Sequence, residues 1–377
     1  MKKLILLGAS GNIGEQTLSI LKKEKITLVG FSVGDRTNKI KSIVKANPSV
    51  KAICVKHYDD KIFDQFPNVK FFVGNKGLLQ LINYVKADIV LNALVGFVGL
   101  APTLEAIKNN IDIALANKES LVVGGELINK ALKHSRSKIY PVDSEHSAIY
   151  KCFKACKKED VKEIIITASG GAFRNLKRNE LKNVKAKDAL KHPTWKMGKR
   201  VTIDSATMLN KGFEIIEAHY LFNYPLNKIK VLMHDESYVH SILKLKNHSY
   251  LGEVTAPSMI NPIRYALSNK KDSKNVKHVK SLNKFGKFHF HEFNENRYPM
   301  VTYALCAIKE KGVMPCILNA SDEVAVDLFL KGKISFLEIE KIVKQSLKKF
   351  KNQTPVTYDL LARIDQKVRN NIMEDYQ

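Results

Sequence analysis

Apolar and polar positions alternate along the first 142 residues in a pattern typical of a layered α/β fold. Short β-prone apolar runs are separated mostly by stretches with helical periodicity and by joints that contain glycine. Because strands joined by helices pack as parallel neighbours, the pattern predicts a doubly wound, Rossmann-like parallel sheet. Strands are predicted at residues 2–7, 26–33, 52–55, 88–94, 112–116 and 138–142.

The pattern changes twice in the rest of the chain. Alternating β runs predict a second sheet in an α/β middle domain, and purely helical periodicity then predicts a small C-terminal helical bundle. Residues 172–200 have no clear periodicity, which is typical of a functional lid. Strands are predicted at 163–167, 230–234, 239–245 and 249–254, and helices at about 300–311, 319–331, 335–349 and 355–373.

A glycine-rich turn separates the first predicted strand from a helical pattern. Its sequence is Gly8-Ala9-Ser10-Gly11-Asn12-Ile13-Gly14, with the spacing G-x-x-G-x-x-G. A turn of this kind between a strand and a helix lets backbone amides and the helix N-terminus cradle a pyrophosphate. The turn therefore predicts a dinucleotide site.

The second predicted strand ends at Gly34-Asp35-Arg36, about twenty residues beyond the last glycine of the turn. An acid at this position binds the ribose 2′-hydroxyl of NAD, whereas an arginine accepts the 2′-phosphate of NADP. The chain carries both residues. The pattern leaves NAD and NADP open, and Arg36 favours NADP.

Two carboxylates follow the predicted strand at 138–142, in the stretch Pro141-Val142-Asp143-Ser144-Glu145-His146. Alternate residues of an extended segment point to the same side, so Asp143 and Glu145 would converge on one point. Two carboxylates that converge must share a proton, face water or hold a cation. The alternative is a helix start, with Asp143 or Ser144 as N-cap and Glu145 in the first turn.

A later helical stretch carries further candidate polar groups. Residues 207–219 have a helical pattern, in which Asn210, Lys211 and Glu214 share one face. An amide, an ammonium and a carboxylate on one face suit a phosphate beside a metal ion, whereas the alternative is an ordinary surface Lys–Glu pair. Gly212 inside this stretch favours a close approach, because glycine costs about 1 kcal/mol in a helix relative to alanine.

Composition narrows the class of protein. The 377 residues include 62 lysines and arginines against 37 acids, a formal net charge of +25. The lysines are spread along the chain without a basic tail or an aromatic-interleaved patch, which indicates a solvated surface and no nucleic-acid partner. No apolar run is long enough to span a membrane. The five cysteines include no C-x-x-C pair, so we expect free thiols and a cytoplasmic location.

Several stretches, in order and spread over nearly the whole chain, form a larger pattern. They are the glycine turn, Ala116-Asn117-Lys118-Glu119-Ser120-Leu121-Val122, the Pro141–His146 stretch, Ala168-Ser169-Gly170-Gly171, His192-Pro193-Thr194-Trp195-Lys196-Met197-Gly198, Asp204-Ser205-Ala206-Thr207-Met208-Leu209-Asn210-Lys211-Gly212 and Leu318-Asn319-Ala320-Ser321-Asp322-Glu323. Together they resemble the 1-deoxy-D-xylulose 5-phosphate reductoisomerase family.

The resemblance implies an oxidoreductase that rearranges and reduces 1-deoxy-D-xylulose 5-phosphate to 2-C-methyl-D-erythritol 4-phosphate, in non-mevalonate isoprenoid biosynthesis. It implies NADPH as cofactor, Mg²⁺ or Mn²⁺ as metal with Co²⁺ as a further candidate, a phosphorylated sugar as substrate and a homodimer. The expected domains are 1–142 for NADPH binding, 143–267 for catalysis, metal binding and dimerisation with the lid at 172–200, a linker at 268–299, and a helical domain at 300–377.

The resemblance also implies roles for individual residues. The metal ligands are Asp143, Glu145 and Glu214, and the catalytic groups are these three with Lys118 and His192. The substrate contacts are Lys118, Ser144, Glu145 and Glu214 around the sugar, Ser169, Ser205, Asn210 and Lys211 at the phosphate, and His192 and Trp195 in the lid. The cofactor positions are Ser10, Gly11, Asn12, Ile13, Asn117, Glu119 and Gly198, to which the end of the second strand adds Gly34, Asp35 and Arg36.

The chain departs from the family pattern in three places. Asp35 stands where a neutral or basic residue is more common, Ala168 and Ala172 replace a glycine and a proline, and Asp322 replaces an asparagine. The competing function is that of another NAD(P)-dependent dehydrogenase of related architecture, which would act on a semialdehyde or polyol phosphate without changing carbon connectivity.

Overall fold

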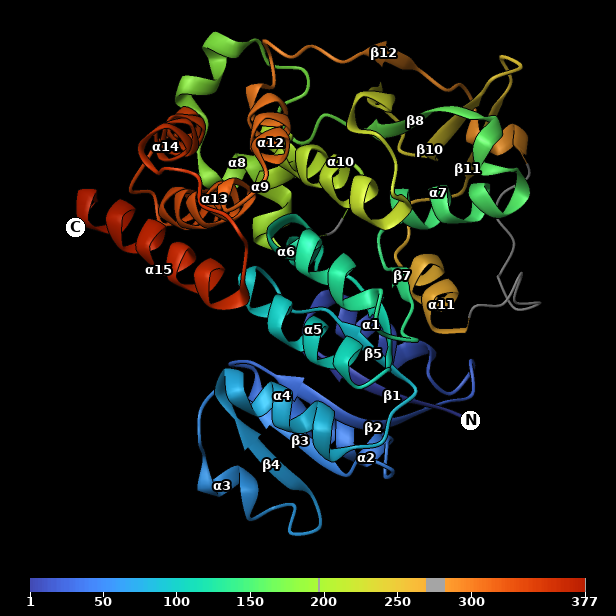
Figure 1. Cartoon of the computed structure of the whole chain (residues 1–377), viewed down its shortest axis with the longest axis vertical. Helices are drawn as coiled ribbons and strands as arrows, with labels where there is room; N and C mark the ends of the chain where they lie inside the picture. Colours follow the sequence, from blue (N-terminus) through green and yellow to red (C-terminus); the bar gives the residue numbers. More distant parts are fainter. Residues whose placement is uncertain (196, 269–281, 377) are drawn as a thin grey trace. The chain divides into compact units, whose positions relative to one another are not determined.

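The computed structural model describes residues 1–195, 197–268 and 282–376 (Figure 1). The chain forms two compact units, each assembled from separate stretches of sequence. Met1–Ser120, Leu127–Ser147 and a stretch beginning at Ser258 belong to the first unit. Leu121–Glu126, Ala148–Pro257 and the C-terminal part belong to the second. The domain boundaries expected from the sequence stay a prediction.

The described residues of the first unit form a parallel sheet. The strand order is β4-β3-β2-β1-β5-β6-β7. β1 lies at the centre of the sheet, β2 to β4 follow outward on one side, and β5 to β7 follow on the other. The predicted doubly wound sheet is thereby confirmed. The strands are β1 (Lys2–Leu7), β2 (Ile26–Val33), β3 (Ala52–Val55), β4 (Lys70–Val73), β5 (Ile89–Asn92), β6 (Asp112–Leu115) and β7 (Ile139–Pro141).

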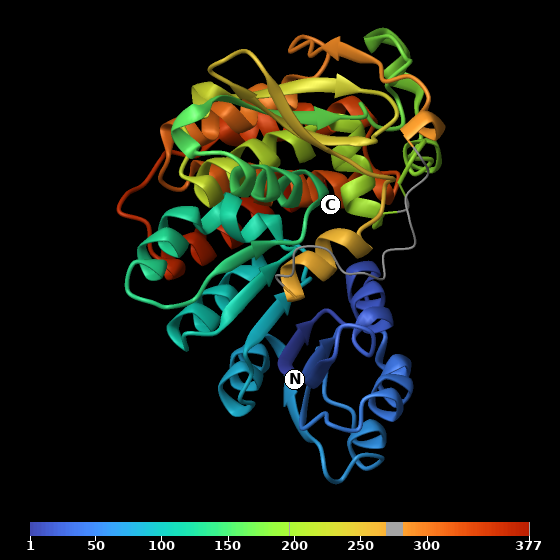
Figure 2. The ribbon, with the colours of Figure 1, turned by 90° about the vertical axis from the view of Figure 1, so that its right-hand side faces the viewer.

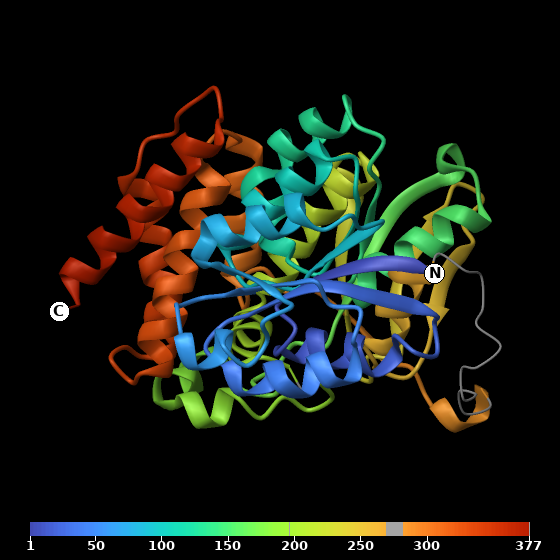
Figure 3. The ribbon, with the colours of Figure 1, turned by 90° about the horizontal axis from the view of Figure 1, so that it is seen from below.

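Helices cover both faces of this sheet. Figure 3 shows α1 (Asn12–Ile20) and α2 (Ile40–Ala46) on one face, with α4 (Gly74–Tyr84) and α5 (Leu100–Lys108) on the other. Strands buried on both faces read as continuous apolar runs, which is why the central strands were recognisable in the sequence. The remaining helices that contain residues of this unit are η1 (Thr37–Lys39), α3 (Asp60–Phe63), η2 (Phe97–Gly99), α6 (Lys118–Leu132), α7 (Ser144–Ala155) and α11 (Ile260–Ser268).

The edge strand β4 was not predicted. Its end residues Lys70 and Val73 are exposed, and Phe71 and Phe72 between them are only partly buried. A strand at the edge of a sheet has one neighbour instead of two, so it buries less apolar surface and leaves a weaker pattern in the sequence.

The second unit contains a mixed sheet with the strand order β11-β10-β8-β9-β12. β8 and β9 are parallel, and the other neighbours are antiparallel. The predicted second sheet is confirmed, and β12 comes from the stretch predicted as a linker, of which residues 269–281 lie outside the described part. The strands are β8 (Val161–Ala168), β9 (Ile229–His234), β10 (Val239–Leu245), β11 (Tyr250–Val254) and β12 (Phe290–Glu292).

The mixed sheet packs over helix α10 (Leu209–Phe222), as Figure 2 shows. Ile164 and Ile166 of β8 share a buried cluster with Ile215 and Ala218 of α10. Each of these side chains is at most 2% exposed. Apolar packing therefore fixes which face of α10 lies against the sheet. The core therefore determines which face of α10 is left for polar groups.

The helical pattern at 207–219 is divided between two helices, α9 (Lys199–Thr207) and α10. Met208 lies between them in the left-handed region, with φ of 64°, and its side chain is buried. The prediction of one helix beginning at residue 207 is wrong at its start, since propensity gives no sign that a buried methionine will adopt this conformation. The break makes Asn210 and Lys211 part of the first turn of α10.

The predicted C-terminal helical bundle is confirmed. Its helices are α12 (Pro299–Glu310), α13 (Met314–Leu330), α14 (Phe336–Lys349) and α15 (Tyr358–Asp375). Strong apolar periodicity made these the most predictable elements, and Ser335 with Glu338 forms a capping box at the start of α14. In the described part of the chain, no helix combines the length and apolarity that crossing a membrane requires.

The first half of the predicted lid is anchored to this bundle. The ring of Phe173 packs edge-on against that of Phe336, with centroids 5.0 Å apart, and the Arg178 guanidinium pairs with the Glu340 carboxylate. The segment also contains the short helices η4 (Arg178–Asn183) and α8 (Ala186–Ala189). Lys196 lies outside the described residues. The other single-turn helices of the unit are η3 (Lys158–Asp160), η5 (Leu226–Lys228) and η6 (Leu282–Phe285).

A buried ion cluster joins α9 to α13 and α15. Nitrogens of Arg200 lie 3.5 Å from a carboxylate oxygen of Asp204, 3.4 Å from one of Asp322 and 2.8 Å from one of Glu323. Arg369 contacts Glu323 at 2.7 Å. Burial raises the pKa of Glu323, but the attraction of Arg200 and Arg369 outweighs it and holds this pKa below its ordinary value. The unusual Asp322 therefore adds a carboxylate to an existing cationic centre.

We expect Arg200→Met to lower the free energy of unfolding by about 3–5 kcal/mol, because it leaves buried carboxylates without a counter-charge. The matched control is Lys331→Met, which removes an exposed ion pair with Asp327, and such pairs contribute less than about 1 kcal/mol. Urea unfolding of both variants measures the difference. Equal losses would contradict a stabilising role for the cluster.

Candidate active site

The glycine turn is tied to the end of β2 at the carboxyl edge of the parallel sheet. The N–H of Ala9 donates to the Ser32 carbonyl at 2.8 Å, and the N–H of Gly8 donates to the Ser32 hydroxyl at 2.9 Å. A Cβ at Gly14 would lie 2.3 Å from the Gly8 carbonyl oxygen, so only glycine lets α1 pack this closely on the turn. This is the arrangement of a phosphate cradle. The turn and the first residues of α1 contain the predicted cofactor positions Ser10, Gly11, Asn12 and Ile13.

Charged side chains gather just beyond the end of β2. The Asp35 carboxylate lies 3.1 Å from the ammonium of Lys56, the residue that follows β3. Arg36 and Lys39 lie 4.0 Å and 3.3 Å from a carboxylate oxygen of Glu15. All five side chains are largely exposed, so they shape the local field more than the stability of the fold.

Asn117 supports the start of α6 after β6. Its side-chain oxygen accepts the N–H of Ser120 at 3.0 Å, and its amide donates to the carbonyls of Leu94 and Gly96, each at 3.0 Å. The same amide also donates to the Glu119 carboxylate at 2.9 Å. Asn117 is fully buried and Glu119 is 7% exposed, so these two predicted cofactor positions form a rigid support at the sheet edge.

Asp143 begins a helix instead of ending a strand. β7 ends at Pro141, and α7 begins at Ser144. One oxygen of Asp143, Oδ1, accepts the N–H of Glu145 at 3.0 Å and that of His146 at 3.2 Å. The expectation that Asp143 and Glu145 alternate along a strand is therefore wrong, and the helix-cap alternative is confirmed. The cap still brings carboxylate oxygens of the two residues within 4.8 Å of one another.

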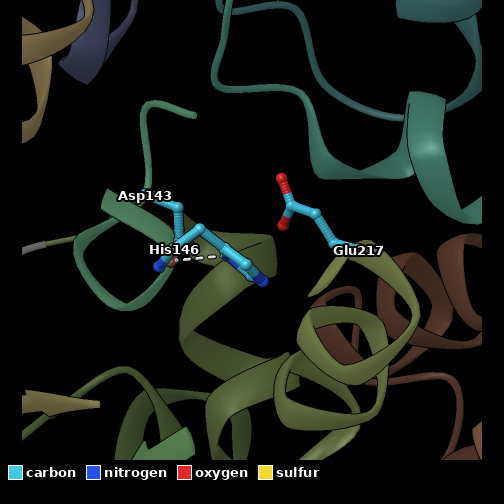
Figure 4. Close-up of side chains that lie close together, drawn as sticks. All are labelled: Asp143, His146 and Glu217. Atoms are coloured by element: carbon cyan, nitrogen blue, oxygen red, sulfur yellow. Dashed lines mark hydrogen bonds and ion pairs between the residues drawn. The ribbon is translucent and has the colours of Figure 1, made fainter. Parts of the chain in front are cut away.

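Asp143 has a further partner on each side. Its second oxygen, Oδ2, lies 3.1 Å from the Lys118 ammonium, and both side chains are largely buried. His146 Nδ1 lies 3.0 Å from Oδ1, as the dashed line in Figure 4 shows. The Ser144 hydroxyl donates to the Glu145 carboxylate at 2.5 Å. The predicted groups of the first unit thus form one connected polar cluster, in which Lys118 offsets part of the acidic charge.

In the second unit, α10 carries the predicted polar face. The Lys211 ammonium lies 2.7 Å from the Glu214 carboxylate, and the Asn210 amide donates to the same carboxylate. Glu214 is 1% exposed. The shared face is confirmed, and the alternative of a surface Lys–Glu pair is wrong because both partners are buried.

Ser169 and Ser205 meet around His192. His192 Nε2 lies 3.3 Å from the Ser169 hydroxyl and 3.2 Å from that of Ser205. Gly171 makes this approach feasible: its φ is +68°, and a Cβ there would lie 2.6 Å from the Ser205 carbonyl oxygen. The loop after β8 therefore lies directly against α9.

The hydrogen bonds of His192 define its tautomer. Nδ1 accepts the N–H of Trp195 at 3.0 Å and that of Thr194 at 3.2 Å, so the ring proton lies on Nε2 and is donated towards the serine hydroxyls. Burial lowers the pKa of His192 to about 4, with further lowering by the positive charges of Arg174 and Lys211. The imidazole is thus neutral at pH 7, in surroundings that favour an anion.

The rest of the predicted lid rests on the turn between β9 and β10. Trp195 packs edge-on against His240 of β10, with ring centroids 6.1 Å apart. The Thr194 hydroxyl lies 3.4 Å from that of Ser237. Trp195 therefore has an aromatic neighbour already in place, and the exposed Gly198 follows at the N-cap of α9.

Family models cover most of the chain. The model described as 1-deoxy-D-xylulose 5-phosphate reductoisomerase matches residues 4–125, and two models of the C-terminal parts of that enzyme match residues 139–222 and 254–371. The chain belongs to the 1-deoxy-D-xylulose 5-phosphate reductoisomerase family.

Individual reductoisomerases agree with this assignment. The enzyme of Clostridium kluyveri is 41% identical over 383 residues, which cover 100% of both chains. That of Thermodesulfovibrio yellowstonii is 42% identical over 348 residues, covering 92% of this chain and 91% of the relative. The Zymomonas mobilis reductoisomerase solved with NADPH has a TM-score of 0.88 and 33% identity, over 98% of this chain and 97% of its own. A reductoisomerase solved with NADPH, fosmidomycin and magnesium has a TM-score of 0.93 and 30% identity, over 99% and 98%.

Three residues that lie beside predicted site residues were given no role in the sequence analysis. Arg174 lies close enough to lower the pKa of His192, but it stands in a stretch without periodicity. Lys56 reaches Asp35 only because β2 and β3 are neighbours. His146 had a usable signal, since it follows Asp143 by three residues at a helix start, where a cap and a residue of the first turn can meet.

We expect phosphate to raise the pKa of His192, because a bound dianion stabilises the imidazolium that its cationic surroundings disfavour. NMR titration of the ring should give about 4 without inorganic phosphate and a value closer to the ordinary 6.5 with it. The exposed His248 is the internal control, and His192→Gln assigns the resonance. An unchanged His192 titration at saturating phosphate would place the anion elsewhere.

Proposed function

We propose that this chain converts 1-deoxy-D-xylulose 5-phosphate to 2-C-methyl-D-erythritol 4-phosphate, with NADPH as reductant and a divalent cation as cofactor. The observation that carries the proposal is family membership over the whole length. The glycine turn, and the buried acidic, basic and serine side chains at positions that match the family's motifs, support it. The product belongs to the non-mevalonate route to isoprenoids.

The donor chemistry fits a hard cation. Asp143 and Glu145 offer carboxylate oxygens within 4.8 Å of one another, and Glu214 offers a buried carboxylate. Mg²⁺ and Mn²⁺ prefer such oxygen ligands, with water or substrate oxygens completing the shell. We assign these three residues as the ligands. Lys118 pairs with Asp143 and Lys211 with Glu214, so both lysines would compete with a cation for these carboxylate oxygens. A bound cation would leave the two ammonium groups available to the substrate.

When bound, the cation polarises the substrate carbonyl and acidifies its hydroxyl, and NADPH supplies the hydride for reduction. The chain's own groups position the reactants. Lys118 and Ser144 lie beside the carboxylates and contact the sugar, with Lys118 placing a positive charge next to its reacting oxygens. Trp195 closes over the sugar and excludes water.

The phosphate lies among Ser169, Ser205, Asn210 and Lys211, within reach of the neutral His192. This group is remote from the reacting carbons, so the free energy of binding it can drive lid closure and orientation. Because the His192 Nε2 proton and two hydroxyls already converge, the site needs little reorganisation to accept the anion.

The cofactor lies along the carboxyl edge of the parallel sheet. Its pyrophosphate contacts the turn of Ser10, Gly11, Asn12 and Ile13 at the start of α1, where the helix N-terminus favours an anion. The adenosine end extends to Gly34, Asp35 and Arg36, and the nicotinamide end to Asn117, Glu119 and Gly198.

We further propose that the enzyme works as a homodimer in the cytoplasm. Support for the dimer is the resemblance to the family and the exposed edge strand β11, where Tyr250 is 62% exposed. Support for the compartment is the cysteine set, whose five members are all free thiols.

The whole protein should oxidise NADPH when 1-deoxy-D-xylulose 5-phosphate and Mg²⁺ or Mn²⁺ are both present, and a chelator should stop it. Absorbance follows the cofactor, and NMR of the product reports its carbon connectivity. Turnover that persists in chelator, with an unrearranged carbon chain, would instead identify a simple dehydrogenase.

Glu214→Gln should reduce turnover by about 100-fold or more, because it removes a charged metal ligand, while NADPH binding is unchanged. The control is Glu163→Gln, which alters a partly exposed carboxylate of β8 paired with Lys244. Titration with Mn²⁺ and with NADPH separates loss of metal from loss of cofactor. Full activity of Glu214→Gln would make the ligand assignment wrong.

A further inference from the structure

The end of β2 carries an acid that argues against NADPH. Asp35 stands where a carboxylate ordinarily accepts the ribose 2′-hydroxyl and repels a 2′-phosphate. Arg36, the next residue, is drawn towards Glu15 of α1, which it shares with Lys39. Two acids, Asp35 and Glu15, thus stand against two cations, Arg36 and Lys39, without a clear excess of positive charge.

The neighbouring strand changes this balance. β2 and β3 are parallel, and Val33 pairs in register with Val55. The residues that follow the two strands therefore emerge side by side at the carboxyl edge of the sheet. Here the Lys56 ammonium lies 3.1 Å and 3.4 Å from the two oxygens of Asp35.

The formal charges of the side chains at this edge of the sheet sum to a positive value. Lys56 offsets Asp35, and Arg36 with Lys39 exceeds Glu15 by one charge. Asp35 is 74% exposed and Lys56 is 56% exposed, so their pairing contributes little to folding. A flexible lysine can turn from the carboxylate to a phosphate oxygen while staying close to both.

We propose that Lys56 determines the preference of this enzyme for NADPH over NADH. It neutralises Asp35, which would otherwise repel the 2′-phosphate, and it adds a second cation beside Arg36 to bind that phosphate. The inference rests on the proposed function, since it takes NADPH as the reductant. NADH has a neutral 2′-hydroxyl at this position, so Lys56 neither binds a phosphate on it nor shields one from Asp35.

Direct binding to the full-length protein tests this without turnover. Calorimetric titration of NADPH, NADH and adenosine 2′,5′-bisphosphate should show Lys56→Ala weakening the two phosphorylated ligands by roughly tenfold or more, since a charge-assisted hydrogen bond is lost. NADH affinity should stay within about twofold. The selectivity of the unaltered protein should also fall as salt screens these exposed charges.

A second substitution separates the two roles of Lys56. Asp35→Asn should leave NADPH binding equal or tighter, and in the Lys56→Ala background it should restore part of the lost affinity by removing the repelling carboxylate. The matched control is Lys51→Ala, which removes the same charge just before β3, at the opposite edge of the sheet. It should alter neither ligand.

Three results would overturn the inference: equal effects of Lys56→Ala on NADPH and NADH, no rescue by Asp35→Asn, or an effect of Lys51→Ala as large as that of Lys56→Ala. If the unaltered enzyme turns over 1-deoxy-D-xylulose 5-phosphate with NADPH while any of these is observed, the inference fails and the proposed function stands. If the unaltered enzyme neither binds NADPH nor turns over this substrate, both fail.

Discussion

The repulsion between acidic groups is the constraint on which this molecule's chemistry depends. A metal site needs carboxylates close together, although unscreened carboxylates at such distances repel strongly. The chain meets this need with lysines: Lys118 lies against Asp143, and Lys211 against Glu214. Lysine suits the role because its ammonium group is carried on a flexible side chain and can turn to another anion. The same two lysines are the groups proposed to contact the sugar and its phosphate.

Two unusual helix starts hold these groups in place. Asp143 caps α7 through one oxygen and contacts Lys118 through the other, so a single carboxylate both fixes a helix and takes part in the site. Met208, in the left-handed region, ends α9 and begins α10 two residues before Asn210. Apolar packing of α10 under the mixed sheet then fixes which face its polar residues occupy. The candidate site residues are thus carried at the starts of helices, where the first backbone N–H groups have no partner within the helix and, in α7, bond to Asp143.

Most of the fold could be predicted from the sequence, and the reasons for the exceptions are physical. Central strands such as Ile26–Val33 and amphipathic helices such as Phe336–Lys349 leave strong local patterns because burial acts on every turn or every residue. The sequence left open whether Asp143 ends a strand or caps a helix, because a short apolar run before an acid fits both. The pairing of Lys56 with Asp35 was out of reach, because it requires the register of two strands that are joined by a helix. The candidate site residues were predicted from family motifs, because local patterns carry no information on contacts between distant segments, and their roles stay predictions.

The anchoring of the lid limits how it can move. Phe173 and Arg178 fix its first half to α14, and Gly198 caps α9 at its other end. The stretch after α8 is held differently, by hydrogen bonds between His192 and the hydroxyls of Ser169 and Ser205 and by the ring contact of Trp195 with His240. The neutral His192 already lies against Ser169 and Ser205, and the positive charges of Arg174 and Lys211 lower its pKa, so an anion bound there would accept a charge-assisted hydrogen bond. The depressed pKa therefore makes this part of the predicted lid responsive to an anion, which is the role proposed for the substrate phosphate.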